Sequence, residues 1–499
     1  MKTLVDENVT LPKKGIAKES ILEQLREMKE GDVNYKDGKT WSLVYYLGEE
    51  HQQFLHDAFT TYLSENGLNP LAFKSLKKME SEVVRMTANM LHGDENVCGT
   101  MTSGGTESCL LAVKTYRDYA KKHKPWIKKP EMIVPESIHV AFEKASSYFG
   151  VKLVRIPLDD DYKVKIDMVK RKINRNTIGI IASAPSYPHG MIDPIEALGE
   201  IAHSHRLPLH VDACLGGFLL PFVEKLQYNV PLFDFRVKGV TSIAADIHKY
   251  GYAAKGASII VYRNMSYLES QFFVSENWAG GVFASPALLG TRAGGAFAAA
   301  WAVLHYFGEE GYVEKTKVIM DTTKKIMNGI QEIDGLEVMS TPPMSVFAYR
   351  STDPKLNIFA VADRLEARGW HIDRQQRPEC LHCMVMPGHE VIADEYIADI
   401  QHAVNEVRDN PHYAYEGGAA MYGMISRVPL RGMVKKQVLQ MMRNLYSPRG
   451  ELPADLAPPE QEVEVMEQAG KGASKTQQKI SLSDRLGHVF IRWRRNNQK

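Results

Sequence analysis

The chain has 499 residues, 44% of them hydrophobic, which is the composition of a globular protein with one large or two to three ordinary domains. Its 61 basic and 60 acidic side chains nearly cancel, so no overall field attracts nucleic acid and a DNA-binding function is disfavoured. Five cysteines, an odd number, favour a reducing compartment over a disulfide framework. Because the N-terminus has no signal-peptide pattern and no segment approaches roughly 18 to 20 apolar residues, we expect a soluble, cytoplasmic protein that is at most peripheral to a membrane.

Residues 1–95 form the first predicted segment, and they are mainly helical. The stretches ESILEQLREMK (19–29) and SLKKMESEVVRMTANMLHG (75–93) repeat apolar residues at helical spacing. Between them, NGLNPLAF (66–73) has the composition of a loop. We therefore expect an N-terminal helical segment.

Residues 96–310 form the predicted large domain, in which short apolar runs alternate with helical patterns. The runs are EMIVPE near 131, KLVRIPL near 152, IGIIASAPS from 178, LPLHVDA from 207 and ASIIVYR from 257. Such alternation predicts a mainly parallel sheet covered by helices on both faces. A Gly-rich connection within 266–310 leads into a predicted long helix.

Two further segments complete the chain. Residues 311–448 read as a smaller α+β domain with candidate strands at GLEVMS and SVFAYR. Residues 449–499 are rich in Pro, Gly, Gln and charge, which predicts a flexible tail. The tail ends in apolar residues at helical spacing among arginines, namely Leu482, Leu486, Val489, Phe490 and Trp493. Such a basic amphipathic helix can lie on an anionic membrane or dock on the parent protein.

The stretch TSGGTES (102–108) precedes a predicted helix and is a candidate phosphate site. Gly104 and Gly105 let the backbone approach a ligand closely, and Thr106 offers a hydroxyl group. The start of the helix directs free N–H groups and the positive end of its dipole at an anion. The same pattern also fits an ordinary loop-to-helix turn with a Ser/Thr cap. It is neither a Walker loop nor a clean GxGxxG motif.

Asp212 closes the buried strand of LHVDACLGG. The carboxyl edge of a parallel sheet is where α/β folds bind ligands. If the ligand is a pyridine ring, this carboxylate can pair with the ring nitrogen and keep it protonated, which makes the ring an electron sink. A capping or salt-bridged aspartate is the alternative.

Lys249, in ADIHKYGY, follows Asp212 by 37 residues, one predicted strand later. A partly desolvated lysine near other cations loses proton affinity and becomes a nucleophile that can form a Schiff base. His139, in the loop after another predicted strand, can stack on a planar cofactor, although a lone histidine is more often structural. A phosphate cradle, a strand-end aspartate and a lysine together are the contacts that pyridoxal 5′-phosphate needs.

Cys380 and Cys383 form a CxxC pair, which is a further candidate motif. No second pair stands at metal-ligand spacing, so we expect the motif to be incidental and predict no metal site.

Four stretches carry a resemblance to a known family: TSGGTES, HVDACLGGF, FDFRVKGVTSIAADIHKYGYAAKG and NWAGGVFASPALLGTRAGG. They resemble the sphingosine-1-phosphate lyases, relatives of the group II pyridoxal-phosphate-dependent decarboxylases, over roughly residues 35–447. The resemblance implies an α/β protein of pyridoxal-phosphate fold type I, with a large domain built on a mainly parallel seven-stranded sheet. It also implies a homodimer with active sites at the interface. The reaction would be retro-aldol C2–C3 cleavage of a long-chain base phosphate to a fatty aldehyde and phosphoethanolamine.

The resemblance also implies residue roles in binding the cofactor. Lys249 would hold pyridoxal 5′-phosphate as a Schiff base, and Asp212 would stabilise the protonated ring. His139 would stack on the ring. The phosphate would be held by Gly104, Gly105, Thr106 and His248.

On the substrate side, Lys255 matches the family's second essential lysine and would serve the phosphate or hydroxyl end of the substrate. Tyr45 matches a tyrosine that reaches in from the other subunit, although the adjacent Tyr46 leaves the register open. Asn66 matches the asparagine of the family's NxLxP loop. Asn69 stands where the family usually has histidine. An amide cannot carry the positive charge or transfer the proton that an imidazole can. Ala254 in place of the usual proline is a milder departure.

Two other functions stay open at the sequence level. A pyridoxal-phosphate-dependent amino-acid decarboxylase would need a cation to seat an α-carboxylate. A non-catalytic protein of the same fold would use its tail to reach a membrane or a partner.

Overall fold

The computed structural model describes residues 2–3, 9–427, 431–448 and 450–452. The chain forms two compact units, one made of residues 34–411 and the other of the described parts of 1–33 and 412–499. The fourfold division expected from the sequence stays a prediction, and the amphipathic stretch 482–493 lies outside the described residues. No described helix combines the length and apolar character needed to cross a membrane.

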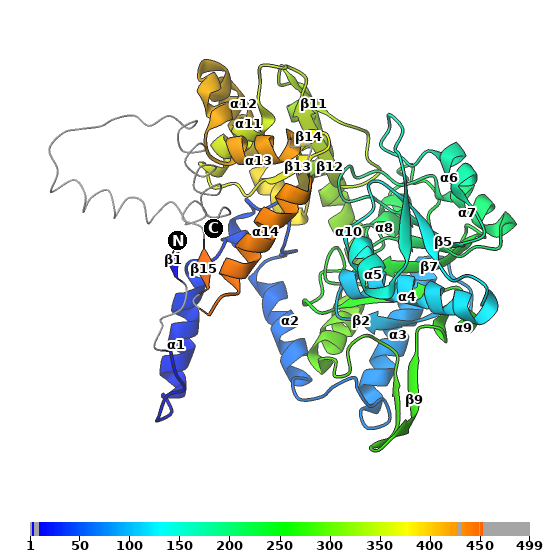
Figure 1. Ribbon diagram of the computed structural model, residues 1–499. Coiled ribbons are helices and arrows are strands. Elements are labelled where there is room, and N and C mark those ends of the chain that lie inside the picture. Colours follow the sequence, from blue (N-terminus) through cyan, green and yellow to red (C-terminus); the bar gives the residue numbers. More distant parts are fainter. Residues whose placement is uncertain (1, 4–8, 428–430, 449, 453–499) are drawn as a thin grey trace, which may run out of the picture. The chain divides into compact units, whose positions relative to one another are not determined.

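A seven-stranded sheet forms the centre of the larger unit (Figure 1). Its strand order is β2-β8-β7-β6-β5-β3-β4, and β8 runs antiparallel to both of its neighbours. The prediction of a mainly parallel sheet is confirmed. The strands are β2 (Cys98–Thr102), β3 (Glu131–Pro135), β4 (Lys152–Ile156), β5 (Thr177–Ser183), β6 (Leu209–Asp212), β7 (Val240–Ala245) and β8 (Ser258–Tyr262).

Both faces of this sheet are buried. Along β8, Ile259 and Val261 join one apolar cluster, while Ile260 and Tyr262 join another on the opposite face. Alternate side chains of a strand point to opposite faces, so a strand buried on both sides is apolar throughout. This is why the apolar runs in the sequence marked the strands.

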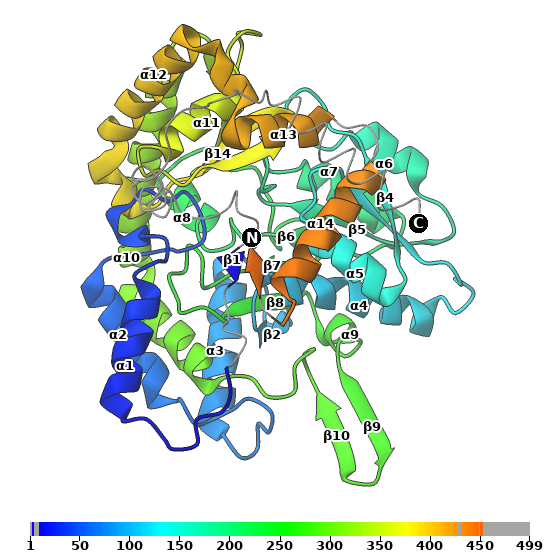
Figure 2. The same ribbon diagram turned by 60° about the vertical axis from the view of Figure 1, so that its left-hand side comes forward.

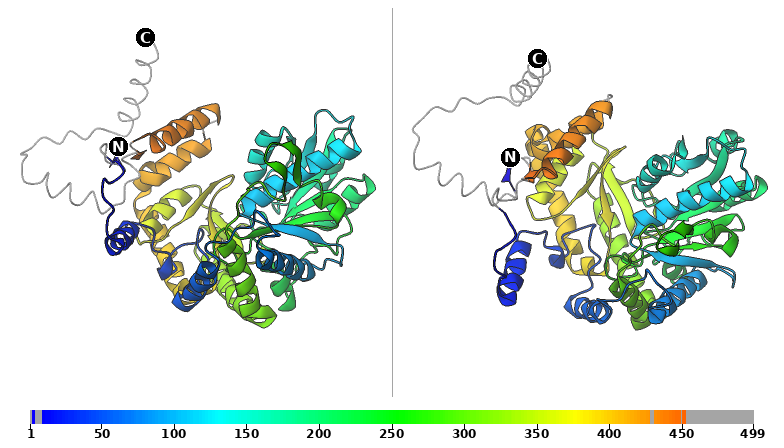
Figure 3. Two further views of the ribbon diagram at one scale, coloured as in Figure 1. Left: turned by 90° about the horizontal axis from the view of Figure 1, so that it is seen from below. Right: turned by 60° about the horizontal axis from the view of Figure 1, so that its bottom comes forward.

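Helices cover the sheet and link its strands. They are α2 (Glu49–Thr61), α3 (Lys74–Met90), α4 (Gly105–His123), α5 (Ala141–Phe149), α6 (Ile166–Lys172), α7 (Ile195–Ser204), α8 (Leu220–Lys225), α9 (Met265–Leu268) and α10 (Gly294–Gln331). The long α10, light green in Figure 3, packs against α2 and α3. It is kinked at Gly308, whose φ of 54° and ψ of −173° are not helical.

A second, four-stranded sheet of order β11-β12-β14-β13 belongs to the same unit. The predicted strands near 335 and 345 are β11 (Leu336–Val338) and β12 (Val346–Ser351), which pair with one another. β12 also pairs with β14 (Glu379–Met384), which in turn pairs with β13 (Asp373–Gln376). Helices α11 (Ile358–Glu366) and α12 (Ala393–Asp409) accompany this sheet, as do the short turns η1 (Tyr35–Asp37) and η2 (Pro387–Ile392).

The Gly-rich connection after β8 contains an antiparallel hairpin that the sequence analysis did not predict, formed by β9 (Phe273–Trp278) and β10 (Gly281–Ser285). The hairpin extends away from the seven-stranded sheet (Figure 2). Its side chains include Phe273, Val274, Trp278 and Val282, which are 56% to 76% exposed. A hairpin with such exposed apolar residues has the composition of a contact surface.

The smaller unit contains α1 (Lys18–Lys29), α13 (Gly417–Arg427) and α14 (Arg431–Leu445). Its short strands β1 (Lys2–Thr3) and β15 (Glu451–Leu452) pair antiparallel. The turn η3 (Pro411–Tyr415) spans the boundary between the units.

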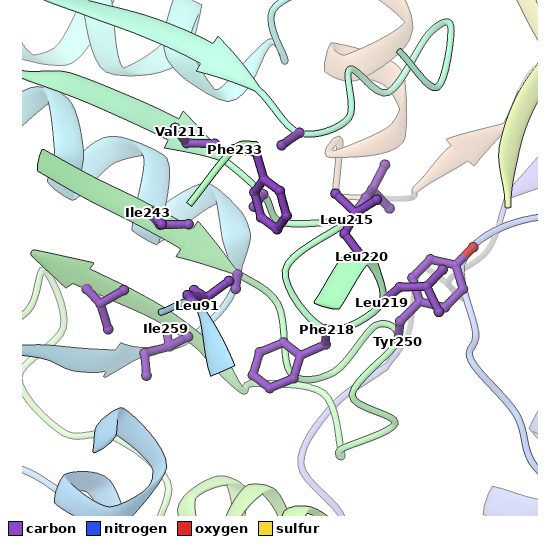
Figure 4. Close-up of a cluster of buried hydrophobic side chains, with 14 of the residues drawn as sticks. Leu91, Val211, Leu215, Phe218, Leu219, Leu220, Phe233, Ile243, Tyr250 and Ile259 are labelled. Carbon is purple, nitrogen blue, oxygen red and sulfur yellow. The ribbon is translucent and has the colours of Figure 1, made fainter. Parts of the chain in front are cut away.

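The main core lies against the seven-stranded sheet, where Phe218, Phe233 and Tyr250 pack among aliphatic side chains (Figure 4). Tyr250 directly follows Lys249, so this core anchors the segment that carries the lysine. The phenol of Tyr250 donates a hydrogen bond to the carbonyl oxygen of Val385 at 3.1 Å.

Truncation of Phe233, which is fully buried, should therefore weaken the larger unit. We expect Phe233→Ala to cost about 3–5 kcal/mol, because the cavity left behind cannot close completely. Urea unfolding monitored by tryptophan fluorescence measures the change. Trp126→Ala, at a side chain that is 67% exposed, is the matched control and should stay within about 0.5 kcal/mol. Equal losses in both variants would contradict this core assignment.

Candidate active site

A cavity of about 270 Å³ opens at the carboxyl ends of β5, β6 and β7. Parallel strands bring their carboxyl ends to one edge, so residues that are far apart in sequence meet there. Its lining comprises Gly105, Thr106, Cys109, His139, Ser183, Pro185, Tyr187, Asp212, Cys214, Leu215, Asp246, His248, Lys249 and Met384. The structure thus brings together six of the predicted cofactor residues, namely Gly105, Thr106, His139, Asp212, His248 and Lys249.

Lys249 lies in the turn after β7, and its Nζ is 2.9 Å from Oδ2 of Asp246. Burial disfavours the charged amine, but the negative charge of Asp246 outweighs burial and raises the pKa of Lys249 above its usual range. We expected cationic neighbours that lower its proton affinity. That expectation is wrong, because the charge beside Lys249 is the carboxylate of Asp246.

Asp246 is a site residue that the sequence interpretation missed, although it stands three residues before Lys249. It is 2% exposed, and its Oδ1 has no hydrogen-bond partner among the described residues. A β-carbon on Gly105 would lie 2.6 Å from its Oδ2. Gly105 is therefore required because the Asp246 carboxyl group occupies the space that any larger residue would need.

The glycine cradle begins α4. Gly104 has a φ of 156°, and Gly105 is the first residue of the helix. Glu107 fixes this loop: its Oε2 accepts a hydrogen bond from the backbone N–H of Ser103 at 2.7 Å, and its Oε1 accepts one from Leu288 at 2.9 Å. The cradle is thus tied to the segment that follows the β9–β10 hairpin.

Asp212 is the last residue of β6, and its Oδ1 accepts a hydrogen bond from the backbone N–H of Cys214 at 3.1 Å. His248 donates from Nδ1 to the carbonyl oxygen of Ala257 at 2.7 Å, which leaves Nε2 as the unprotonated nitrogen of the neutral ring. Burial lowers the pKa of His248, so the ring is neutral near pH 7. Nδ1 of His139 accepts a hydrogen bond from the N–H of Ala141 at 3.2 Å.

Tyr187 also lines the cavity and was missed. Its phenol donates to Oδ2 of Asp373 at 3.3 Å, and Nε2 of His382 donates to its backbone carbonyl oxygen at 2.8 Å. Burial and the charge of Asp373 raise the pKa of Tyr187 above its usual range. A tyrosine shortly after the strand end in ASAPSYPHG was the available signal in the sequence.

Tyr45, rather than Tyr46, lies beside the site. The Tyr45 phenol is 3.7 Å from Sδ of Met384, and Nζ of Lys255 lies 5.5 Å from the centre of its ring. The phenol of Tyr46 instead donates to Glu49 at 2.8 Å. Tyr45 lies beside the site of its own chain, and a role across a subunit interface stays a prediction.

Lys255 does not line the cavity of Lys249 but a neighbouring one of about 180 Å³. Thr102, Ser103 and Arg292 also line this second cavity, so the TSGG loop separates the two. Nζ of Lys255 donates to the carbonyl oxygen of Leu43 at 2.7 Å. Burial and the charge of Lys249 lower the pKa of Lys255.

Asn66 and Asn69 are not brought to either cavity within one chain. Oδ1 of Asn66 accepts a hydrogen bond from the N–H of Leu68 at 3.1 Å, and Oδ1 of Asn69 accepts one from Leu71 at 3.0 Å. Both side chains therefore support local turns in the loop between α2 and α3.

The residues present fit pyridoxal 5′-phosphate. The cradle has no β-carbon at Gly105, and an amine and a strand-end carboxylate line the same cavity. In addition, the buried Oδ1 of Asp246 has no hydrogen-bond partner among the described residues and can accept a hydrogen bond from a ligand.

Comparisons with known proteins agree with this geometry. Residues 2–352 match the pyridoxal-dependent decarboxylase conserved domain. The chain is 44% identical to a sphingosine-1-phosphate lyase of Oryza sativa over 440 residues, 87% of this chain and 81% of the relative. It is 42% identical to sphingosine-1-phosphate lyase 1 of Rattus norvegicus, over 88% of this chain and 77% of that protein. The solved sphingosine-1-phosphate lyase of Burkholderia pseudomallei superposes with a TM-score of 0.78 at 35% identity, covering 87% of this chain and 97% of that one.

The opposite pKa shifts of the two lysines give a testable order of reactivity. Only a neutral amine acylates, so in cofactor-free protein Lys255 should react at lower pH than an ordinary lysine and Lys249 only at higher pH. In Asp246→Asn the carboxylate no longer raises the pKa of Lys249, and burial alone lowers it. The pH at which Lys249 begins to react should therefore fall by at least about one unit. Pulsed acetylation at stepped pH, read by peptide mass spectrometry, measures both lysines, with the exposed Lys121 as internal reference. An unchanged Lys249 profile in the variant would contradict the role given to Asp246.

Proposed function

The chain belongs to the sphingosine-1-phosphate lyase family of pyridoxal-dependent enzymes, and we propose that it cleaves the C2–C3 bond of a phosphorylated long-chain base. The products are a fatty aldehyde and phosphoethanolamine. The observation that carries the proposal is that Lys249, Asp212 and the cradle residues Gly105 and Thr106 line one cavity. Identity of 42–44% to lyases over most of the chain supports the same reaction.

The cofactor is pyridoxal 5′-phosphate, which, when bound, acts as the electron sink for breaking a bond at C2. Lys249 is the residue that would hold it covalently, and Asp212 would keep the ring nitrogen protonated. His139 would lie on the face of the ring. Its phosphate would be held by Gly104, Gly105 and Thr106, and by the Nε2–H of His248 once the phosphate charge favours the protonated ring.

Proton balance requires that the C3 hydroxyl group lose its proton as the C2–C3 bond breaks and that C2 gain one afterwards. The phenols of Tyr45 and Tyr187 are candidates for donating the proton to C2, because their raised pKa values keep them protonated. The amine of Lys249, which the substrate amine would displace from the cofactor, could accept the proton of the C3 hydroxyl group. Asp373 holds the phenol of Tyr187 in place. Tyr45 lies between Met384, which lines the first cavity, and Lys255, which lines the second.

The second cavity is the proposed place for the substrate phosphate. Lys255 supplies a cation there, and Thr102 and Ser103 supply hydroxyl groups. A phosphate anchored at one cavity and an amine reacting at the other would fix the angle of the bond at C2, which decides the reaction type.

We infer that the enzyme is a homodimer whose partner brings Asn66 and Asn69 to this phosphate. The exposed apolar side chains of the β9–β10 hairpin and the position of both asparagines outside their own chain's cavities support this inference. An asparagine at 69 offers hydrogen bonds without charge, so the phosphate clamp relies more on Lys255. The five free cysteines support a cytoplasmic location.

The reaction itself provides the main test. Incubation with sphingosine 1-phosphate and with its dihydro form should yield fatty aldehyde and phosphoethanolamine in equal amounts, measured by mass spectrometry. Lys249→Ala should abolish both products. Release of carbon dioxide from amino acids, with no aldehyde from either lipid, would instead establish a decarboxylase.

The two adjacent tyrosines provide a second, residue-level test. Tyr45→Phe should lower kcat by about 100-fold, the usual contribution of a positioned proton donor. Tyr46→Phe, which removes only the hydrogen bond to exposed Glu49, should leave kcat close to that of the unaltered enzyme. Steady-state kinetics with either lipid measures both, and bound cofactor, read from its absorbance, should be equal in both variants. A larger loss in Tyr46→Phe would reverse the assignment.

A further inference from the structure

Two thiols and a carboxylate meet on the wall of the cofactor cavity. Cys109 lies in the second turn of α4, while Asp212 and Cys214 lie at the end of β6. The two sulfur atoms and a carboxylate oxygen of Asp212 all lie within 4.8 Å of one another. All three side chains are buried, and all three line the cavity of about 270 Å³.

This arrangement resembles the ligand set of a thiophilic metal ion. Ligands about 2.3 Å from one ion cannot be more than about 4.6 Å apart, so the three atoms need to shift only slightly to share a cation. Two sulfur ligands favour Zn²⁺ and softer ions over Mg²⁺ or Ca²⁺. Because all three residues line the cavity, water from the cavity could complete the coordination of the ion.

The electrostatics of the cavity also favour a cation. The hydrogen bond with Cys214 lowers the pKa of Cys109, but burial and the charges of Asp212 and Asp246 together raise it to about 11. A thiol so hard to ionise reacts poorly with oxidants, which disfavours a disulfide switch. The same carboxylates that oppose a thiolate attract a metal ion, and a bound ion itself displaces the thiol protons.

We propose that Cys109, Cys214 and Asp212 bind a thiophilic divalent cation such as Zn²⁺, and that this cation and pyridoxal 5′-phosphate exclude one another. On binding, two metal–sulfur bonds and one metal–oxygen bond form, and each thiol releases one proton to solvent. The exclusion rests on the proposed function, since Asp212 cannot serve both the metal and the pyridine nitrogen. A cavity of 270 Å³ is also small for two ligands.

Direct binding to cofactor-free protein tests the metal site. Cd²⁺ is the spectroscopic probe, because its thiolate complexes absorb in the ultraviolet. Binding of Zn²⁺ is measured by equilibrium dialysis. One cation per chain should bind at the cavity, and Cys109→Ser or Cys214→Ser should weaken binding at least about tenfold. Cys98→Ser, at a half-buried thiol outside the cavity, is the matched control and should bind Cd²⁺ as the unaltered protein does.

Retained pyridoxal 5′-phosphate binding by the cysteine variants shows that they are folded. Equal Cd²⁺ affinity in the Cys109→Ser/Cys214→Ser double variant overturns the site.

The holoenzyme tests the exclusion. Zn²⁺ should release pyridoxal 5′-phosphate, measured in the filtrate after ultrafiltration, and the half-maximal Zn²⁺ concentration should rise in proportion to added free cofactor. Cys109→Ser holoenzyme should resist release. Zn²⁺ bound at the thiols beside fully retained cofactor would overturn the exclusion. None of these measurements uses the lipid substrate, so an enzyme that fails to produce aldehyde refutes the proposed function without affecting this result.

Discussion

The ion pair between Asp246 and Lys249 is the interaction on which the cavity depends. The side chains of Lys249 and Asp246 are 26% and 2% exposed, so loss of the lysine would leave a buried carboxylate unpaired, which typically costs about 3–5 kcal/mol. The pair holds the lysine amine at the carboxyl edge of the sheet before any cofactor arrives. It also fixes Gly105, since the carboxyl group of Asp246 fills the space above the first turn of α4.

The second sheet contributes to the same cavity from a distant part of the chain. Asp373 on β13 and His382 on β14 hold Tyr187 by its phenol and by its backbone, and Met384 at the end of β14 contacts Tyr45. The seven-stranded sheet thus supplies the groups for the cofactor. The four-stranded sheet positions the tyrosines proposed to act on the substrate.

The sequence predicted the parts of this site that follow from local order. Asp212 is the last residue of a strand, Lys249 and the glycine cradle follow strands closely, and strand ends converge in a parallel sheet. The hydrogen bond between Tyr187 and Asp373 spans 186 residues, and no local pattern reveals such a contact. We predicted positive charge beside Lys249, but the neighbouring charge is negative. The carboxylate of Asp246, three residues earlier in the chain, turns back toward the amine. Lys255 lies only six residues beyond Lys249, yet the intervening loop directs it to a different cavity.

The bridging carboxylate of Glu107 has a consequence for assembly. It bonds one backbone N–H in the cradle and another just beyond the exposed hairpin, so neither segment can move without straining the other. Burial of the hairpin by a second chain would restrict the cradle, and an occupied cradle would in turn hold the hairpin ready for that chain. Coenzyme retention and self-association would then be thermodynamically linked, and dilution would loosen both.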